Sequence, residues 1–479
     1  EFDEFAEALM GQLSVEIDEE KVIAELAKKI KEDRSFTVEF DDIESVSKNL
    51  FVDLVQSVNE YMGLEVSKEL SIEYLKLDEK NPLKRIREKF NYPENSKSPV
   101  LYFSGNSLGL QPKAVPSILV EQSEIWGKHG AKAYFSDWIN FHKNLIKDFL
   151  PIVGAEEGEI MLMNALTVNL HLLLISFYQP TKVRHKIIIE EDAFPSDQYA
   201  IISQLHFHGY DPNTSLVKLK PQPNKKCLDT DDIINTIRSH GDSVATVMLG
   251  GVNYYTGQKY DMKEISKVSN EIGAYVGFDL AHAAGNVKLD LHNWNVDFAA
   301  WCNYKYLNSG PGSPSGIFIH NKHSEWSGPR LAGWWGNSMD SRFTMDSNFD
   351  PIKGAEGWSI SNSPIFSMAP IKASLDIYSK VGINNFIKAS RQLTGYLENL
   401  INTVLPRIDI ITPKLEEERG CQLSMIINEG KEVQKYLELN NVVCDWREPD
   451  VIRIAPNPLY NTYNEVFQLV YLLKNYFDK

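Results

Sequence analysis

The segment Tyr275-Val-Gly-Phe-Asp279-Leu-Ala-His282 joins a short β-rich run to polar residues that follow it directly. Two similar runs, at residues 186–189 and 245–249, have the length and apolar character of buried strands. Helical patterns separate the runs and lie near residues 195–207, 230–239 and 262–272. Strands that alternate with helices predict βαβ units, so the expected fold class is α/β, with a mostly parallel central sheet and helices on both faces.

The sequence changes character towards its C-terminal end. Residues 320–365 are rich in Gly, Pro, Ser and Trp without periodicity, so we expect loops there. A long helical stretch follows Pro370, and short strands are expected at 422–427 and 451–454. Because a last helical pattern covers residues 462–477, this end predicts a smaller C-terminal α/β domain.

The first hundred residues indicate helices and loops, with apolar residues at helical spacing near 22–30 and 46–54. Residues 1–50 hold 15 acidic and 6 basic side chains, which is typical of a solvated acidic extension rather than of a partner site. The expected domains are an acidic helical extension of unknown role (1–48), an N-terminal arm or small-domain segment (49–110), a large ligand-binding domain (111–369) and a small C-terminal domain (370–479).

Composition and charge exclude several classes of protein. The 479 residues include 65 acidic and 49 basic side chains, and a net charge of −16 argues against a general nucleic-acid binder, which needs a basic face. The longest apolar run, 170–178, is far shorter than the roughly 18 residues of a membrane span, and the chain opens without the basic segment of a secretory signal. The chain has four cysteines, and no two of them form a CxxC pair: Cys227, Cys302, Cys421 and Cys444. We therefore expect a reducing, cytoplasmic location and no zinc site.

Two residues on this scaffold point to a cofactor. Asp279 follows a predicted strand, and Lys305 stands 26 positions later in Tyr304-Lys-Tyr-Leu-Asn-Ser-Gly310. Each residue alone is ordinary, since a lone lysine is usually on the surface and a lone aspartate after a strand is usually a cap. Together they predict a pyridoxal phosphate (PLP) site. This cofactor needs a lysine amine for its aldehyde and a carboxylate that keeps its pyridine nitrogen protonated. Parallel sheets bind ligands at the carboxyl ends of their strands, where Asp279 lies.

The phosphate of such a cofactor needs backbone N–H donors at the start of a helix. Leu166 and Thr167 precede an apolar helical pattern, so their N–H groups and the Thr167 hydroxyl are candidates, although a simple helix cap explains the same residues. Phe194, after the predicted strand 186–189, could stack on a flat ring or equally pack as a hydrophobic staple.

Several stretches of the sequence together resemble the kynureninase family of fold type I, aspartate-aminotransferase-like PLP enzymes. The resemblance runs from about residue 50 to the end of the chain. Its motifs are specific only in combination. They are Phe103-Ser-Gly-Asn-Ser-Leu-Gly-Leu-Gln-Pro112, Met163-Asn-Ala-Leu-Thr-Val-Asn169, Phe194-Pro-Ser-Asp197, Tyr255-Thr-Gly-Gln258, Val276-Gly-Phe-Asp-Leu-Ala-His-Ala-Ala-Gly-Asn286, Tyr304-Lys-Tyr-Leu-Asn308, Gly333-Trp334, Ile360-Ser-Asn362 and Ile452-Arg-Ile-Ala-Pro456.

The resemblance implies a role for each matching residue. Lys305 would bind the cofactor covalently, and Asp279, with His282 nearby, would pair with the ring nitrogen. The implied phosphate contacts are Leu166, Thr167 and Tyr304, and the implied ring contacts are Phe194 and Asp197. Trp334 and Asn362 would reach cofactor and substrate across a homodimer interface. Arg453 would hold the substrate α-carboxylate, Ser107 in the first matching stretch would contact substrate, and Lys305, Asp279 and Tyr304 would be the catalytic residues.

Three positions leave questions open. Gly250 stands where family members often carry a serine, so one side-chain contact to the cofactor is lost or replaced. His129 is the candidate for a substrate-side histidine, although an exposed residue at a helix end would look the same. Asn362 stands where bacterial family members that prefer the unhydroxylated substrate resemble one another in a threonine, so it predicts a preference for 3-hydroxykynurenine, unless it only caps the turn before Pro364.

The resemblance implies hydrolysis of L-kynurenine and 3-hydroxy-L-kynurenine to L-alanine and anthranilate or 3-hydroxyanthranilate, within tryptophan catabolism and NAD precursor synthesis. A cysteine desulfurase of the same fold is the alternative, with Cys421 as its nucleophile, 116 residues after Lys305. The acidic residues just before Cys421 would raise its thiol pKa, and Tyr304 stands where desulfurases resemble one another in a histidine. A catalytically dead scaffold is a second alternative, against which the Lys305–Asp279 pair argues.

Overall fold

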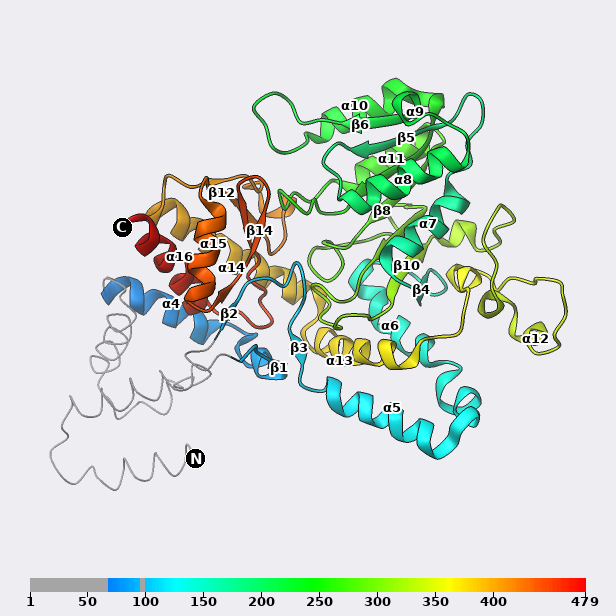
Figure 1. Cartoon of the computed structure of the whole chain (residues 1–479), viewed down its shortest axis with the longest axis horizontal. Helices are drawn as coiled ribbons and strands as arrows, with labels where there is room; N and C mark the ends of the chain where they lie inside the picture. The colour runs from blue at the N-terminus through cyan, green and yellow to red at the C-terminus, as the bar shows by residue number, and fades with distance from the viewer. Residues whose placement is uncertain (1–67, 95–99) are drawn as a thin grey trace.

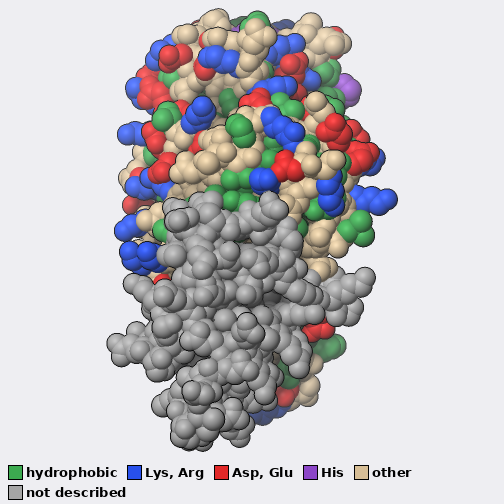
Figure 2. All heavy atoms as spheres, turned by 90° about the vertical axis from the view of Figure 1, so that its left-hand side faces the viewer, with side chains coloured by type: hydrophobic (Ala, Val, Ile, Leu, Met, Phe, Trp, Pro, Cys, Tyr) green, Lys and Arg blue, Asp and Glu red, His purple; other side chains and the backbone are tan. Residues whose placement is uncertain are grey.

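The computed structural model describes residues 68–94 and 100–479 (Figure 1). The chain forms a larger lobe around a seven-stranded sheet and a smaller lobe that contains the C-terminus. The helices predicted near residues 22–30 and 46–54 lie outside the described residues. The coloured part of the face in Figure 2 carries Lys and Arg interspersed with Asp and Glu.

The central sheet confirms the α/β prediction. Its strands, in spatial order, are β4 (Ile160–Met163), β10 (Ser315–Ile319), β9 (Phe298–Trp301), β8 (Tyr275–Asp279), β7 (Val244–Gly250), β5 (Lys186–Glu190) and β6 (Leu216–Leu219). The five strands from β9 to β6 are parallel, whereas β10 runs antiparallel to both β9 and β4. The three strands predicted from β-rich runs are β5, β7 and β8, which lie side by side.

Helices cover both faces of this sheet because consecutive strand residues point to opposite sides. On one face, Val276 and Phe278 pack in a core with α10 (Thr230–His240) and α11 (Met262–Glu271). On the other face, alternate strand residues pack with two further helices, α7 (Leu166–Phe177) and α8 (Pro195–Phe207). The strands are therefore buried on both sides, as their nearly unbroken apolar runs predict.

The smaller lobe is built on an antiparallel sheet with the order β11 (Asp409–Ile410), β12 (Leu423–Ile426), β15 (Val451–Ile454) and β14 (Asp445–Arg447). Its helices are α14 (Ile383–Val404), α15 (Gly430–Leu439), α16 (Tyr463–Phe477) and α4 (Lys68–Lys80). Parts of the described chain before residue 104 join this lobe, since Tyr74 and Phe103 lie in its core and β2 (Leu101–Tyr102) pairs with β13 (Val442–Val443). The exact domain boundaries remain a prediction.

In the described part of the chain, three helices complete the larger lobe: α5 (Val115–His129), α6 (Phe141–Val153) and α13 (Ile365–Val381). Helices α5 and α13 lie along the lower side of Figure 1, and α13 leads into α14 of the smaller lobe. Helix α13 begins five residues before Pro370, so this proline lies inside the helix and the helical stretch starts earlier than predicted.

Short elements complete the chain. They are β1 (Phe90–Asn91), β3 (Gln111–Pro112), α9 (Pro212–Ser215), α12 (Met339–Arg342), η2 (Lys84–Lys89), η3 (Gly130–Lys132), η4 (Tyr134–Trp138), η5 (Gly241–Ser243), η6 (Asn321–His323), η7 (Trp334–Gly336), η8 (Ala355–Trp358) and η9 (Glu416–Glu418). The predicted loop region 320–365 contains only short helical turns of three or four residues before α13 begins. Within residues 68–94 and 100–479, none of the helices has the length and apolar character that a membrane crossing requires.

Candidate active site

A cavity of about 630 Å³ opens at the carboxyl ends of β5, β7 and β8. This is the edge at which an open α/β sheet binds its ligands. Most of the candidate site residues line it, namely Ser107, Leu166, Thr167, Phe194, Asp197, Gly250, Asp279, His282, Tyr304, Lys305 and Arg453. The fold thus brings together side chains that are more than 300 positions apart in the sequence, such as Ser107 and Arg453.

Lys305 lies in a loop after β9 and reaches into this cavity. Its Nζ is 3.0 Å from Nε2 of His282 and 6.0 Å from the centroid of the Phe194 ring. Burial and the nearby Lys305 charge hold the pKa of His282 well below its usual range, so the imidazole is neutral and accepts a hydrogen bond from the lysine. The loop is braced by Gly109, whose N–H donates to the Tyr304 carbonyl at 2.8 Å and whose place leaves no room for a Cβ beside Lys305.

Two buried carboxyls face each other near Lys305. Asp279 ends β8 and accepts the N–H of Ala281 at 2.8 Å, and Asp197 in the first turn of α8 shares a hydrogen bond with it. Burial raises the pKa of both groups, and the Asp279 charge raises the pKa of Asp197 further, whereas the Lys305 charge lowers both. Asp197 therefore holds the proton and donates it in a hydrogen bond, so Asp279 carries the negative charge.

The start of α7 forms an anion cradle on another side of the cavity. The helix begins at Leu166 after Ala165, and no described side chain caps its free N–H groups. The Thr167 hydroxyl lies 2.7 Å from that of Ser196, so two hydroxyls stand beside the positive end of the helix. An anionic group in the cavity can satisfy these donors.

These features fit pyridoxal phosphate. The uncapped start of α7 suits its phosphate, the anionic Asp279 suits its ring nitrogen, and Lys305 suits its aldehyde carbon. The aromatic face of Phe194 and the volume of the cavity suit its planar ring.

Arg453 projects from β15 towards the same cavity. Its guanidinium donates to the Tyr254 carbonyl at 2.7 Å, to the Ser107 hydroxyl at 3.3 Å and to the Asp445 carboxylate. Its Nε has no hydrogen-bond partner among the described residues. Arg447, which also lines the cavity, pairs with the other Asp445 oxygen at 2.9 Å. Arg453 and Arg447 together carry two positive charges, and Asp445 neutralises only one of them. The remaining positive charge suits an anionic substrate.

Three candidate residues do not line this cavity in the described part of the chain. His129 is the exposed last residue of α5, Trp334 in η7 is 51 % exposed, and Asn362 is exposed with its Nδ2 3.4 Å from the Tyr134 hydroxyl. The sequence reasoning in turn missed Glu190 and Asp445. Glu190 ends a strand as Asp279 does, so the rule that found Asp279 could have found it.

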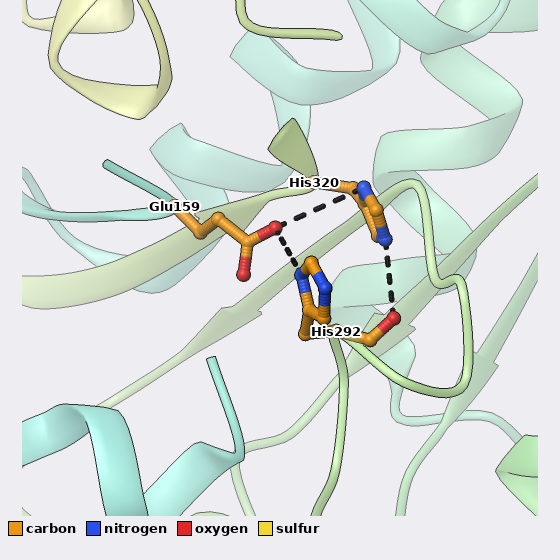
Figure 3. Close-up of side chains that lie close together, drawn as sticks. All are labelled: Glu159, His292 and His320. Atoms are coloured by element: carbon orange, nitrogen blue, oxygen red, sulfur yellow. Dashed lines mark hydrogen bonds and ion pairs between the residues drawn. The ribbon is translucent and has the colours of Figure 1, made fainter. Parts of the chain in front are cut away.

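A second cluster of titratable groups lies away from the cavity and consists of Glu159, His292 and His320 (Figure 3). Glu159 Oε1 accepts from Nδ1 of His292 at 2.8 Å, and Nδ1 of His320 is 3.8 Å from it. However, Nδ1 of His320 accepts the Lys322 N–H at 3.0 Å, and the two imidazoles stack at 16° with centroids 4.7 Å apart. Because nearly parallel rings do not aim their lone pairs at one centre, the arrangement is a hydrogen-bonded brace rather than a metal site.

Cys421 is not placed as a nucleophile. Its side chain is buried in the core, its sulfur lies 3.2 Å from the Ser390 hydroxyl, and burial raises the pKa of its thiol to about 12. A thiol in this environment stays protonated and cannot reach a substrate in the cavity. The desulfurase alternative was therefore wrong as a statement of function.

The sheet topology and the site define a PLP-dependent enzyme of fold type I. The chain belongs to the kynureninase family. The family profile for the kynureninase C-terminal domain matches residues 387–473. The kynureninase of Flavobacterium psychrophilum is 48 % identical over 407 residues, which cover 83 % of this chain and 96 % of that protein. The kynureninase of Myxococcus xanthus is 44 % identical, with 84 % and 96 % covered.

Solved structures share the fold at low sequence identity. A cysteine desulfurase from Thermococcus onnurineus matches with a TM-score of 0.66 at 16 % identity, over 79 % of this chain and 94 % of that one. The cysteine desulfurase CsdA from Escherichia coli gives a TM-score of 0.67 at 16 % identity, over 83 % and 98 %. These similarities support the fold alone, whereas the sequence relatives distinguish the family.

Proposed function

We propose that this chain hydrolyses L-kynurenine and 3-hydroxy-L-kynurenine, releasing L-alanine together with anthranilate or 3-hydroxyanthranilate. The observation that carries the proposal is the convergence of Lys305, Asp279 and Arg453 on one cavity in a chain of the kynureninase family. This activity belongs to tryptophan breakdown, and through 3-hydroxyanthranilate to NAD precursor synthesis. We also infer a cytoplasmic location from the four cysteines, which are free.

Each residue of the cavity has a defined task in this reaction. PLP, when bound, supplies an electron sink for the bonds that break at Cα and Cβ of the substrate. The charge of Asp279 holds the proton on the ring nitrogen that makes this possible, and protonated Asp197 keeps that charge on Asp279. The start of α7 would anchor the phosphate and Asp279 would pair with the ring nitrogen, so the bound ring would be held at two points.

The substrate is held and deprotonated by basic groups on the other side of the cavity. Arg453 binds the α-carboxylate, for which its free Nε and the neighbouring Arg447 provide donor and charge. The free amine of Lys305 takes the proton from Cα, and the resulting ammonium donates to neutral Nε2 of His282 at 3.0 Å. Water then adds to the γ-carbonyl, and cleavage of the Cβ–Cγ bond releases the aromatic acid.

We further propose that two copies of the chain share their active sites. A surface of exposed aromatic side chains supports this, and we call it the aromatic face: Trp126, Tyr134, Phe135, Trp334, Phe343 and Phe366. Neighbouring rings touch across it, with 5.6 Å between the Phe135 and Phe343 centroids and 5.7 Å between Trp334 and Phe343. Contiguous exposed apolar surface of this kind marks a protein interface. Trp334 and Asn362 would then reach the cavity of the partner subunit.

The first experiment follows the cofactor and the product together. The purified protein should be yellow, should release alanine from kynurenine, and should trap PLP on Lys305 after borohydride reduction. Lys305→Ala should lose alanine release and the trapped label, whereas the control Lys288→Ala, at an exposed lysine, should keep both. A label on another lysine, or sulfide release from cysteine without alanine release from kynurenine, would contradict the proposal.

A further inference from the structure

Glu190 is a buried carboxyl at the cavity that the reaction described above does not use. It ends β5, is 4 % exposed and lines the cavity together with Asp279. Its Oε1 accepts the N–H of Gly250 at 3.0 Å. Its Oε2 has no hydrogen-bond partner anywhere in the described part of the chain. A buried carboxyl oxygen without a partner is costly, so its place at a ligand cavity calls for a function.

Gly250 leaves this carboxyl open to the cavity. A Cβ at residue 250 would lie 3.0 Å from Glu190 Oε1, closer than a normal contact. A serine there would therefore stand against the carboxylate and present its own hydroxyl to the ligand. With glycine, residue 250 places no side chain between the Glu190 carboxyl and the cavity that both residues line.

The surroundings of Glu190 favour its protonated form. The ionisable groups that face it are acidic or phenolic: Asp192 after β5, Asp197 on α8, Asp279 on β8 and Tyr260 before α11. Burial, followed by the charges of Asp279 and Asp192, raises the pKa of Glu190 to about 7. Below this pH the carboxyl is neutral and has an O–H to donate, and above it the site gains a negative charge.

We propose that Glu190 is a positioning residue for bound PLP, which donates a hydrogen bond from Oε2 where Gly250 offers no side chain and adds a charge beside Asp279 when it ionises. PLP accepts hydrogen bonds at its phenolic oxygen and its phosphate but not at a protonated ring nitrogen, and the start of α7 would take the phosphate, so the donated bond would go to the phenolic oxygen. Ionisation would add a negative charge at the cavity, which favours the protonated form of titratable groups on the bound cofactor. The inference concerns cofactor binding and does not depend on which substrate the enzyme takes.

The test is a pH titration of the visible absorption of the holoenzyme, with PLP affinity measured alongside. Glu190→Gln keeps an acceptor for Gly250 and a donor towards the cavity but cannot ionise. It should bind PLP within about threefold of wild type and should lose the spectral change centred near neutral pH. Glu190→Leu should weaken PLP binding by about tenfold or more, because the donor is gone.

A matched control is Glu191→Gln, the same chemical change one residue away, where the side chain pairs with Lys220 at 2.8 Å on the surface. It should leave both the titration and the affinity unchanged. Gly250→Ser gives an independent test in a chain that keeps Glu190, and it should shift the spectral midpoint by restoring a hydroxyl between the carboxyl and the cofactor. If Glu190→Gln and Gly250→Ser both titrate like wild type, and Glu190→Leu binds PLP normally, the proposal is overturned.

Discussion

The active site has a cofactor end and a substrate end, and the residues assigned to them differ in whether they line the cavity of a single chain. At the cofactor end, Lys305, Asp279, Asp197 and Thr167 all line one cavity and lie on or just after elements of the central sheet. At the substrate end, Arg453 comes from the smaller lobe, and Trp334 and Asn362 are exposed and do not line the cavity. One chain therefore supplies the residues of the cofactor end, whereas recognition of the substrate ring would depend on a second copy if two subunits share their sites as we propose.

The largest expected effect separates cofactor chemistry from cofactor binding. Asp279→Asn cannot hold the proton on the ring nitrogen, so turnover should fall by about a hundredfold to a thousandfold while PLP stays bound. Single-turnover rates and the bound-cofactor spectrum measure the two quantities. The control Asp290→Asn, at an acid outside the cavity lining, should leave both unchanged. Near-normal rates for Asp279→Asn would show that another group performs this task.

The next effect falls on the substrate end alone. Arg453→Leu removes the α-carboxylate donor and leaves Asp445 buried without its main counter-ion, so transition-state stabilisation should fall by about 2–5 kcal/mol, which lowers kcat/KM at least about thirtyfold. PLP affinity should stay within about threefold, because Arg453 lies on the lobe that does not hold the phosphate. A variant that loses PLP and substrate in parallel would show that the two ends are not separable.

Asp279 at the cofactor end could be predicted from sequence because parallel sheets bind ligands at the carboxyl ends of their strands. Asp279 follows a recognisable strand, and β5, β7 and β8 appear where the apolar runs place them. The Arg453–Asp445 pair could not be found this way, because it depends on the register between β14 and β15, where these two residues face each other. His129 was a candidate only through the family resemblance, and its side chain is exposed at the end of α5.

A smaller effect tests whether Asn362 contributes to substrate choice across the proposed homodimer interface. If Asn362 of one subunit bonds the ring hydroxyl of the substrate held by its partner, wild type should prefer 3-hydroxykynurenine, and Asn362→Thr should reduce the ratio of kcat/KM values by about tenfold to a hundredfold. Steady-state kinetics with both substrates measure the ratio. An unchanged ratio would leave Asn362 as the cap of a turn. Ser361→Thr is a suitable control next to it.

The smallest effect belongs to the brace of Glu159, His292 and His320, outside both ends of the site. The hydrogen bond to Glu159 raises the pKa of His292, so its stabilisation is present below the unfolded pKa and is lost as pH rises through the folded value. Because His292 is partly exposed, we expect about 0.5 kcal/mol. Denaturant unfolding from pH 6 to pH 9 should show this loss in wild type but not in His292→Gln, with catalysis unaffected in both.

Complementation between two inactive variants tests the division between the two ends most directly. Lys305→Ala removes the catalytic amine from one subunit, and Trp334→Ala removes a rim residue from the other. Mixed dimers contain one site with both residues if Trp334 serves the partner's cavity, so mixing equal amounts under conditions of subunit exchange should restore about a quarter of wild-type activity. If each subunit uses its own Trp334, one site of a mixed dimer lacks Lys305 and the other lacks Trp334. No activity above that of the single variants would then appear, and the shared site would be contradicted.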